Sequence, residues 1–479
     1  MLKDLAKSIL IYGVASSIGK FIGLFLVPIY TRIFSPDQYG VIDLISTVVA
    51  LVSIFGMAQL ESAISRYYFA VKEDGKRRLY VSTAFWTIIV LSIFWTVFIL
   101  LLAEHVSVLL FKTTQYRNVI LIASLIIPFS NMFSFLTVLM RYIKKPLIYT
   151  IFVTIQLLST VGISVWLVVF ERIGIIGVFY GQLSGFVLGA GAMLFYLRFL
   201  LLFAWNWDVL KRFFRYSLPM VPAVAGNWLN SYANRFVMLG YLSLVDIGLY
   251  TVALKIASLF RLLDSAFRMA WGPFMWENFE RPDHREIYQK VMKIVSIGVF
   301  SVVAIVALFG SEILLLLTTQ AYANAGPLIG MLGFSIGLTI VGQTIGLGAG
   351  ITKRTEFITL IYFASVCANI ACLFLLVPAI GLIAVPLCLL ISTTVLVVLA
   401  WWNSERLYYI GFSKMFFGMA YMGTLICVAI PVMVDVSVLL KIIMVAIVLA
   451  FFIAMLLKGK EPVLRLNSIK NGLFSKAGQ

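Results

Sequence analysis

The chain has 479 residues, of which 62% are hydrophobic and 12% are charged, and its formal net charge is +17. Soluble domains carry about a quarter charged residues, so this composition excludes a soluble protein and indicates a polytopic membrane protein. The four cysteines fall in apolar stretches and the two histidines in loops, without the spacing of a disulfide framework or a metal site. We therefore expect no metal ion and no cofactor.

Apolar stretches of the length that crosses a bilayer as a helix follow one another along the whole chain. Counting them predicts an all-α protein with about 14 transmembrane helices. Their approximate ranges are 8–32, 39–70, 79–103, 118–141, 146–170, 174–197, 216–240, 247–276, 291–317, 326–351, 356–378, 381–402, 414–434 and 437–457.

Lys and Arg are distributed unevenly between the two sides that this helix count defines. With the N-terminus inside, most of the 37 basic residues fall on the cytoplasmic side, for example in the predicted loop 198–215. The positive-inside rule therefore predicts that both termini lie in the cytoplasm, and it accounts for most of the net charge without a nucleic-acid partner. The opposite side holds only Arg32, Lys112, Arg117 and Arg172.

An internal repeat joins the two halves of the chain at an offset of 208 residues. Ser35 matches Ser243 and Gly40 matches Gly248, and in both places a turn opens a long helix. The repeat predicts two six-helix lobes in the same orientation, with a ligand site near the midplane between them. The predicted divisions are residues 1–200 for the first lobe, 201–405 for the second, and 406–479 for helices 13 and 14 and a tail.

Ionisable residues inside the first two predicted helices are the first candidates for a site, because a charge in a membrane helix is unfavourable and usually functional. Lys20 lies near the middle of the first helix, where it either contacts an anionic ligand or pairs with Glu61 or Asp264. Glu61 is also a candidate to bind a cation or carry a proton. Arg66 follows on the same helix as a further cationic candidate, while Asp43 caps the helix or lines an entrance.

The seventh predicted helix combines helix-breaking residues with a polar face. Pro219 and neighbouring residues predict a bent or broken helix, which a membrane protein tolerates only where neighbours or water satisfy the freed backbone. Asn227, Asn230 and Asn234 recur at helical spacing, and Arg235 adjoins their face. These amides are suited to bind sugar hydroxyls, and the alternative is packing between helices through polar side chains.

The eighth predicted helix carries an excess of positive charge. Arg261, Asp264 and Arg268 are spaced three and four residues apart and share one face, whereas Lys255 points elsewhere. One carboxylate neutralises only one guanidinium, and the remaining charge suits an anion such as a pyrophosphate. The alternative is a salt-bridged cluster at the membrane interface.

No pattern of a soluble enzyme is present, neither a phosphate-binding loop nor a zinc-protease motif nor a large loop with acidic clusters. We therefore predict that the chain is not an enzyme. A membrane polymerase or an assembly scaffold remains the alternative from another class.

A motif of the form P-x-Y-T-R-x-x-S/T-P-x-x-Y/F-G occupies residues 28–40. With this motif and its predicted helices, the chain resembles the polysaccharide transporter family of the multidrug/oligosaccharidyl-lipid/polysaccharide (MOP) flippase superfamily, and within it the O-antigen or exopolysaccharide repeat-unit flippases. The resemblance implies two lobes around a central cavity, alternating access, a polyprenyl-pyrophosphate-linked substrate and a place in the bacterial inner membrane. The alternatives within the superfamily are a cation-coupled multidrug exporter, for which a cationic cavity is a poor host, and a lipid II flippase.

The resemblance gives the candidate residues their expected roles. Glu61 and Asp264 would couple transport to protons or sodium ions. Asn227, Asn230 and Asn234 would contact sugars, and a polysaccharide polymerase is a possible partner. Contacts with the anionic head group are expected from Lys20, Arg66, Arg235, Lys255, Arg261 and Arg268.

Overall fold

The computed structural model describes residues 23, 25–71, 73–143, 145–352, 354, 356–434 and 436–458, without the side chains of Asn227, Asn230 and residues 456–458. Every regular element in this part of the chain is helical. Ten of the described helical stretches are long and apolar enough to cross a membrane. The predicted all-α membrane fold is therefore confirmed, whereas the count of 14 helices stays a prediction, since the first span falls largely outside the described residues.

Two compact units make up the chain. Unit 1 contains residues 1–256, 315–323 and 370–385, and unit 2 contains residues 257–314, 324–369 and 386–479. These units are defined by contacts, whereas the predicted lobes are defined by an internal repeat of the sequence. The division into lobes therefore stays a prediction.

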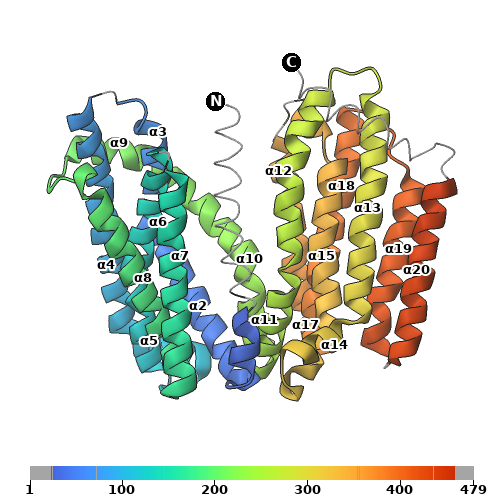
Figure 1. Cartoon of the computed structure of the whole chain (residues 1–479), viewed down its shortest axis with the longest axis horizontal. Helices are drawn as coiled ribbons and strands as arrows, with labels where there is room; N and C mark the ends of the chain where they lie inside the picture. Colours follow the sequence, from blue (N-terminus) through green and yellow to red (C-terminus); the bar gives the residue numbers. More distant parts are fainter. Residues whose placement is uncertain are drawn as a thin grey trace. The chain divides into compact units, whose positions relative to one another are not determined.

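A bundle of long helices forms the first part of unit 1 (Figure 1). Its helices are apolar over most of their length, and their buried faces meet in a cluster that includes Phe85, Phe133 and Phe135. The bundle consists of α2 (Pro36–Met57), α4 (Asp74–Phe111), α5 (Arg117–Ser124), α6 (Ile126–Tyr142), α7 (Pro146–Val165) and α8 (Ile175–Leu197).

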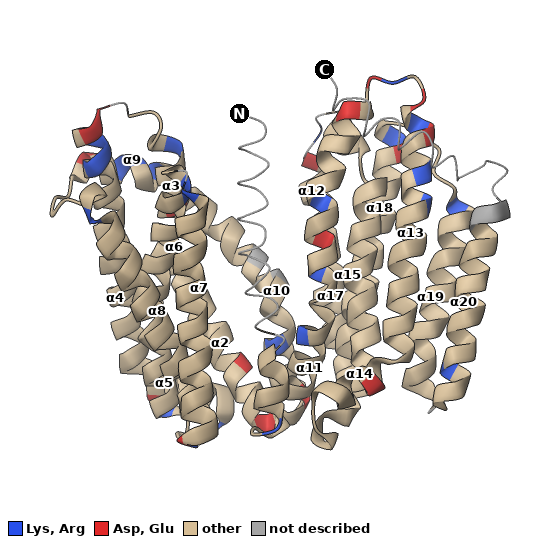
Figure 2. Ribbon diagram, in the orientation of Figure 1, with Lys and Arg blue, Asp and Glu red and all other residues tan. Residues whose placement is uncertain are grey.

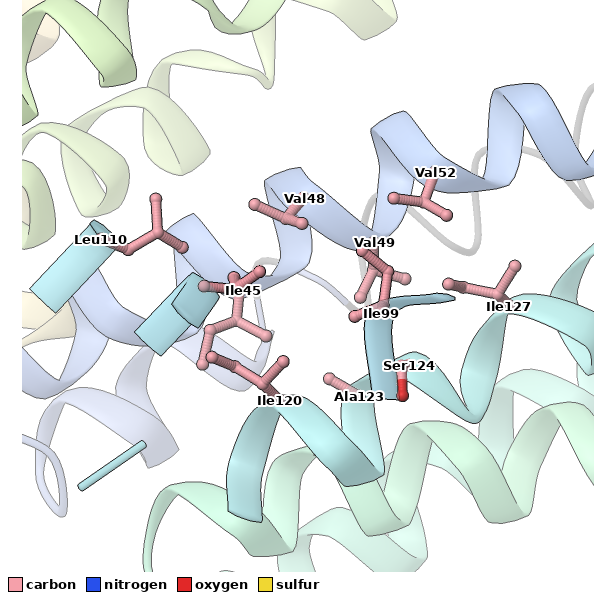
Figure 3. A pocket seen from close by; sticks show the side chains of 11 residues that line it. Ile45, Val48, Val49, Val52, Ile99, Leu110, Ile120, Ala123, Ser124 and Ile127 are labelled. Atoms are coloured by element: carbon pink, nitrogen blue, oxygen red, sulfur yellow. The ribbon is translucent and has the colours of Figure 1, made fainter. Parts of the chain in front are cut away.

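The apolar face of α2 packs into this bundle. Figure 3 shows Ile45, Val49 and Val52 of α2 directed toward side chains of α5 and α6 such as Ile120 and Ile127. The space left between them is about 10 Å³, which is about the minimum that one water molecule needs. Because this face is closed, the polar residues of α2 lie on its other sides.

A break divides the helix that the sequence predicts over residues 39–70. α2 ends at Met57, and the next two residues, Ala58 and Gln59, have left-handed φ angles of 47° and 55°. α3 (Leu60–Tyr67) then begins in a new direction and carries Glu61 in its first turn. Neither Ala nor Gln favours a positive φ, so the apolar pattern alone gives no signal for this break.

The residues after α8 form a helix where the sequence predicts a loop. α9 (Trp207–Ser217) buries Val209, Leu210 and Phe213 and exposes its basic residues. It is too short to appear in a count of membrane spans. A 3₁₀ turn (Leu218–Met220) follows at the place where the prolines predict a break, and then α10 (Val221–Tyr241) and α11 (Leu244–Ala257).

The first turns of α2 and α11 touch backbone to backbone. A Cβ atom added to Gly40 would overlap the carbonyl oxygen of Leu244, and one added to Gly248 would overlap that of Pro36. The contact is reciprocal: each glycine meets the first residue of the other helix, and both pairs differ by the 208 residues of the repeat. Small residues of this kind allow close helix crossings in membrane proteins.

Unit 2 is a second bundle around an aromatic core that includes Phe300, Phe334 and Phe417. An ion pair joins the buried Lys441 to the half-buried Glu312, with 2.6 Å between Nζ and Oε1. Most residues of the bundle belong to α12 (Phe260–Asn278), α13 (His284–Leu308), α14 (Gly310–Leu317), α15 (Gly326–Ile345), α17 (Glu356–Ile380), α18 (Ala384–Leu407), α19 (Lys414–Met433) and α20 (Val438–Lys458).

Candidate functional site

The charged residues of α2 and α10 meet inside unit 1. The Arg235 side chain, in a residue only 4% exposed, donates from Nε to Asp43 Oδ2 and from Nη2 to Asp43 Oδ1, the second contact at 3.5 Å. Its Nη1 also donates to the Ser231 carbonyl oxygen at 3.3 Å. Arg235 therefore has an anionic partner, as an arginine in a membrane helix requires.

Two tyrosine rings complete the surroundings of this guanidinium. Its carbon lies 4.9 Å from the ring centre of Tyr232 and 5.7 Å from that of Tyr250. The Asn234 amide nitrogen lies 3.5 Å from the Tyr250 hydroxyl. Aromatic faces attract cations, so Arg235 is stabilised here by rings as well as by the carboxylate.

Lys255 of α11 lies against the same helix α2. Its Nζ donates to the Tyr39 hydroxyl at 2.8 Å and sits 4.7 Å from the centre of that ring. Tyr39 precedes Asp43 by one helical turn, so α2 supplies a partner for each of two cations. We refer to Tyr39, Asp43, Arg235, Tyr250 and Lys255 as the α2 charge cluster.

The predicted candidates on α3 have different surroundings. Glu61 is half-buried, and the nearby cation whose charge acts on it is Arg141. Arg66 is exposed and stacks over the Tyr216 ring at 5.2 Å.

In unit 2, the three predicted residues of α12 lie along one helix, where Figure 2 shows basic and acidic positions following one another. Asp264 accepts from Arg268 and from Gln343 Nε2, the latter at 2.5 Å. Arg261 is exposed, and within the part of the chain that the structure describes it forms no ion pair. The acidic residue is thus engaged twice, while one cation is left available to a ligand.

Three of the predicted site residues lie beyond what the structure describes. Lys20 falls outside the described residues, and Asn227 and Asn230 belong to α10 but their side chains are not described.

The sequence identifies the cations of the α2 charge cluster but not their partners. It favours a cap or entrance role for Asp43, whereas this residue forms the ion pair with Arg235. Nothing in the sequence singles out Gln343 as a partner of Asp264. A weak signal exists for the α2 residues, since Tyr39 and Asp43 are four residues apart on one predicted helix and Tyr39 belongs to the motif at residues 28–40.

The donor groups of these residues are of the kinds that bind phosphates and sugars. Among the described residues, no group of three or more His, Cys, Asp or Glu side chains could hold a metal ion. The groups present are guanidinium, ammonium, amide and phenol donors, which suit a phosphate or a sugar.

Known proteins share both the sequence pattern and the fold of this chain. A family model described as "Polysaccharide biosynthesis protein" matches residues 29–327. The succinoglycan biosynthesis transport protein ExoT of Rhizobium meliloti (strain 1021) is 23% identical over 360 residues, which cover 71% of this chain and 69% of that protein.

Solved structures with the same fold are also membrane transporters. The lipid II flippase MurJ in an inward closed conformation superposes with a TM-score of 0.73 at 14% identity, covering 94% of this chain and 99% of that one. An inward-facing multidrug resistance transporter of the MATE family gives 0.61 at 14% identity, covering 84% and 98%. At this identity the likeness shows the fold alone.

Proposed function

This chain belongs to the polysaccharide biosynthesis protein family, and we propose that it is a flippase that carries a polyprenyl-pyrophosphate-linked oligosaccharide repeat unit across the bacterial inner membrane by alternating access. The observation that carries this proposal is that one exposed cation of α12 pairs with no described carboxylate, whereas the other arginines of α10 and α12 do. Arg235 pairs with Asp43 and Arg268 with Asp264. Lys255 contacts the Tyr39 hydroxyl, and Arg261 forms no ion pair with the described residues. An anionic head group is the ligand that an exposed guanidinium without a carboxylate partner favours.

The head group would be bound by cations and the sugars by amides. Arg261 is the strongest candidate in unit 2, because it is exposed and its neighbour Asp264 is already engaged. Lys255 and Arg235 are the candidates in unit 1, and Lys20, Arg66 and Arg268 are proposed for the same role. Asn227, Asn230 and Asn234 are proposed to contact the sugars.

The Arg235–Asp43 pair suggests how binding and conformation are linked. A pyrophosphate that approaches Arg235 competes with Asp43 for the same guanidinium, and a phosphate accepts two parallel hydrogen bonds as a carboxylate does. Asp43 would then need a proton or another cation in place of Arg235. We propose this exchange as one step of transport, with Glu61 and Asp264 as further candidates for coupling to H⁺ or Na⁺.

Direction and partners follow from the proposed topology. With both termini in the cytoplasm, the substrate would enter from the cytoplasmic leaflet and leave to the outer leaflet. A polysaccharide polymerase would be the enzyme that consumes it there.

Three alternatives compete with this proposal. A cation-coupled multidrug exporter shares the fold, but cationic drugs are repelled by a cationic site. A lipid II flippase also shares the fold and would use the same cations, so it differs only in the group that its substrate carries on the pyrophosphate. A polymerase or scaffold would need no intramembrane cations at all.

The test is a leaflet assay with the purified full chain in sealed vesicles. A polyprenyl-pyrophosphate sugar with a fluorescent label is placed in both leaflets, and a membrane-impermeant reductant bleaches the outer label. Vesicles that contain the protein should lose nearly all the fluorescence, whereas protein-free vesicles should lose about half. Equal bleaching in both would overturn the proposal. A cationic dye retained in the vesicle lumen serves as the substrate that distinguishes a drug exporter.

A further inference from the structure

A pocket between the ends of α17 and α18 in unit 2 has no role in the function proposed above. It has a volume of about 380 Å³. Its polar lining comes from Arg354, Arg406 and Asn403, and its apolar lining includes Phe357 and Leu360. Charged and apolar side chains therefore line the same pocket.

The two guanidinium groups of this pocket are available to a ligand. Arg354 and Arg406 are exposed, and neither pairs with a carboxylate anywhere in the described ranges. Glu405, the acidic residue next to Arg406, instead accepts from the backbone N–H groups of Gly411 and Phe412, at 3.1 to 3.4 Å. Arg406 is held over the Trp402 ring at 5.6 Å, which restricts where its charge can lie.

Asn403 is the second, independent observation. The residue is only 6% exposed, yet no described group forms a hydrogen bond with its amide. Buried residues usually have their polar groups hydrogen-bonded, so an amide that lines a pocket without a described partner is free to bind a polar group there. One donor amide and two guanidinium groups together fit a phosphate.

The outer wall of the pocket consists of large apolar side chains that are exposed. Leu360 and Trp402 line the pocket and are 61% and 62% exposed, and their neighbours Phe363 and Val398 are 67% and 51% exposed. Large apolar side chains exposed on membrane helices contact acyl chains. A ligand that fills the pocket must therefore have an apolar part that extends along α17 and α18 as well as a charged head.

We propose that this pocket binds an anionic glycerophospholipid, with its phosphate on Arg354, Arg406 and Asn403 and one acyl chain along Phe357 and Leu360. Basic pockets between membrane helices on the cytoplasmic side bind anionic head groups in this way. The site is separate from the α2 charge cluster, and its occupation does not depend on the transported substrate.

The test uses the full chain in nanodiscs of phosphatidylcholine, titrated with phosphatidylglycerol and followed by native mass spectrometry. Each basic residue at an anionic surface contributes about fivefold, so Arg354→Gln with Arg406→Gln should weaken phosphatidylglycerol binding about thirtyfold. Asn403→Leu keeps both charges and should weaken it several-fold. The matched control is Arg285→Gln with Lys414→Gln, which removes the same charge from exposed positions of the same unit and should leave binding unchanged.

Three outcomes would overturn the proposal. The first is equal binding of phosphatidylglycerol by the Arg354/Arg406 variant and the control variant. The second is equal binding of phosphatidylglycerol and phosphatidylcholine by the wild-type chain. The third is displacement of the lipid by millimolar inorganic phosphate, which would identify a soluble anion as the ligand. If the double variant does not fold, Asn403→Leu decides between the same outcomes.

Discussion

Arg235 of α10 and Arg261 of α12 occupy opposite environments, although the sequence presents both as an arginine in a predicted membrane helix. Arg235 is buried, pairs with Asp43 and lies between two tyrosine rings. Arg261 is exposed and is left without an ion pair by the described neighbours. The first arginine is therefore paired, so a ligand must compete with Asp43 for it, and the second is available to a ligand directly. A charge in a membrane helix is thus evidence of importance but does not say whether folding or binding needs it.

We expect Arg235→Ala to be the most destabilising single substitution in the α2 charge cluster. It leaves the Asp43 carboxylate, 14% exposed, buried without its cation. Removing one partner of a buried pair is destabilising by about 3–5 kcal/mol. Thermal unfolding of the purified chain in detergent measures this. Asp43→Asn combined with Arg235→Met should recover most of the loss, and a single variant as stable as the wild type would contradict a structural role.

Gly248→Ala tests a contact that contains no charge at all. The added methyl group would overlap the Pro36 carbonyl oxygen, so the first turns of α2 and α11 must separate. Overpacking of this kind is destabilising by about 1–3 kcal/mol. Gly240→Ala is the control, because a Cβ atom there meets nothing within 4 Å. Unchanged unfolding temperatures for both variants would mean that the crossing has room for a side chain.

Tyr39→Phe should have a smaller effect. It removes the hydroxyl that accepts from Lys255 but keeps the ring beneath the ammonium group. The loss of one such hydrogen bond is destabilising by about 0.5–1.5 kcal/mol. Tyr241→Phe, at a half-exposed ring on α10, should change the unfolding temperature less. If both variants lower the unfolding temperature equally, the hydrogen bond of the Tyr39 hydroxyl does not stabilise the fold.

Arg261→Gln should have the smallest effect on stability and a clear effect on transport. An exposed substitution changes the free energy of unfolding by about 0.5 kcal/mol or less. A lost charge-assisted hydrogen bond to a phosphate is worth about 1.5–3 kcal/mol, which corresponds to a transport rate at least about tenfold lower. The leaflet assay measures this rate, with Arg285→Gln as the exposed control. Wild-type transport by the Arg261 variant would remove α12 from the proposed binding surface.

The fold class could be predicted from the sequence because apolar spans of this length have one stable solution in a bilayer. The breaks inside these spans could not. Ala58 and Gln59 adopt positive φ angles that their side chains do not favour, so tertiary packing must impose them. α9 escapes detection for a different reason, since an 11-residue amphipathic helix is shorter than the window that finds membrane spans.

For the candidate site, too, the sequence reveals what depends on nearby residues and not what depends on residues far along the chain. Arg235 and Lys255 could be identified because an ionisable residue in an apolar stretch is visible in the sequence itself. Their partners could not, because Asp43 is 192 residues from Arg235 and Tyr39 is 216 residues from Lys255. Such pairs depend on which helices become neighbours, and a single sequence carries no direct record of that.

The meeting of Gly40 and Gly248 has a mechanical consequence. Most helix contacts are interlocked by side chains, which must leave one set of grooves and enter another before the helices can turn. At this crossing the two backbones meet without side chains, and a change of angle has no such barrier to overcome. The first turns of α2 and α11 therefore form a pivot, a point at which the angle between the two helices can change. It is built from the two glycines that the 208-residue offset relates.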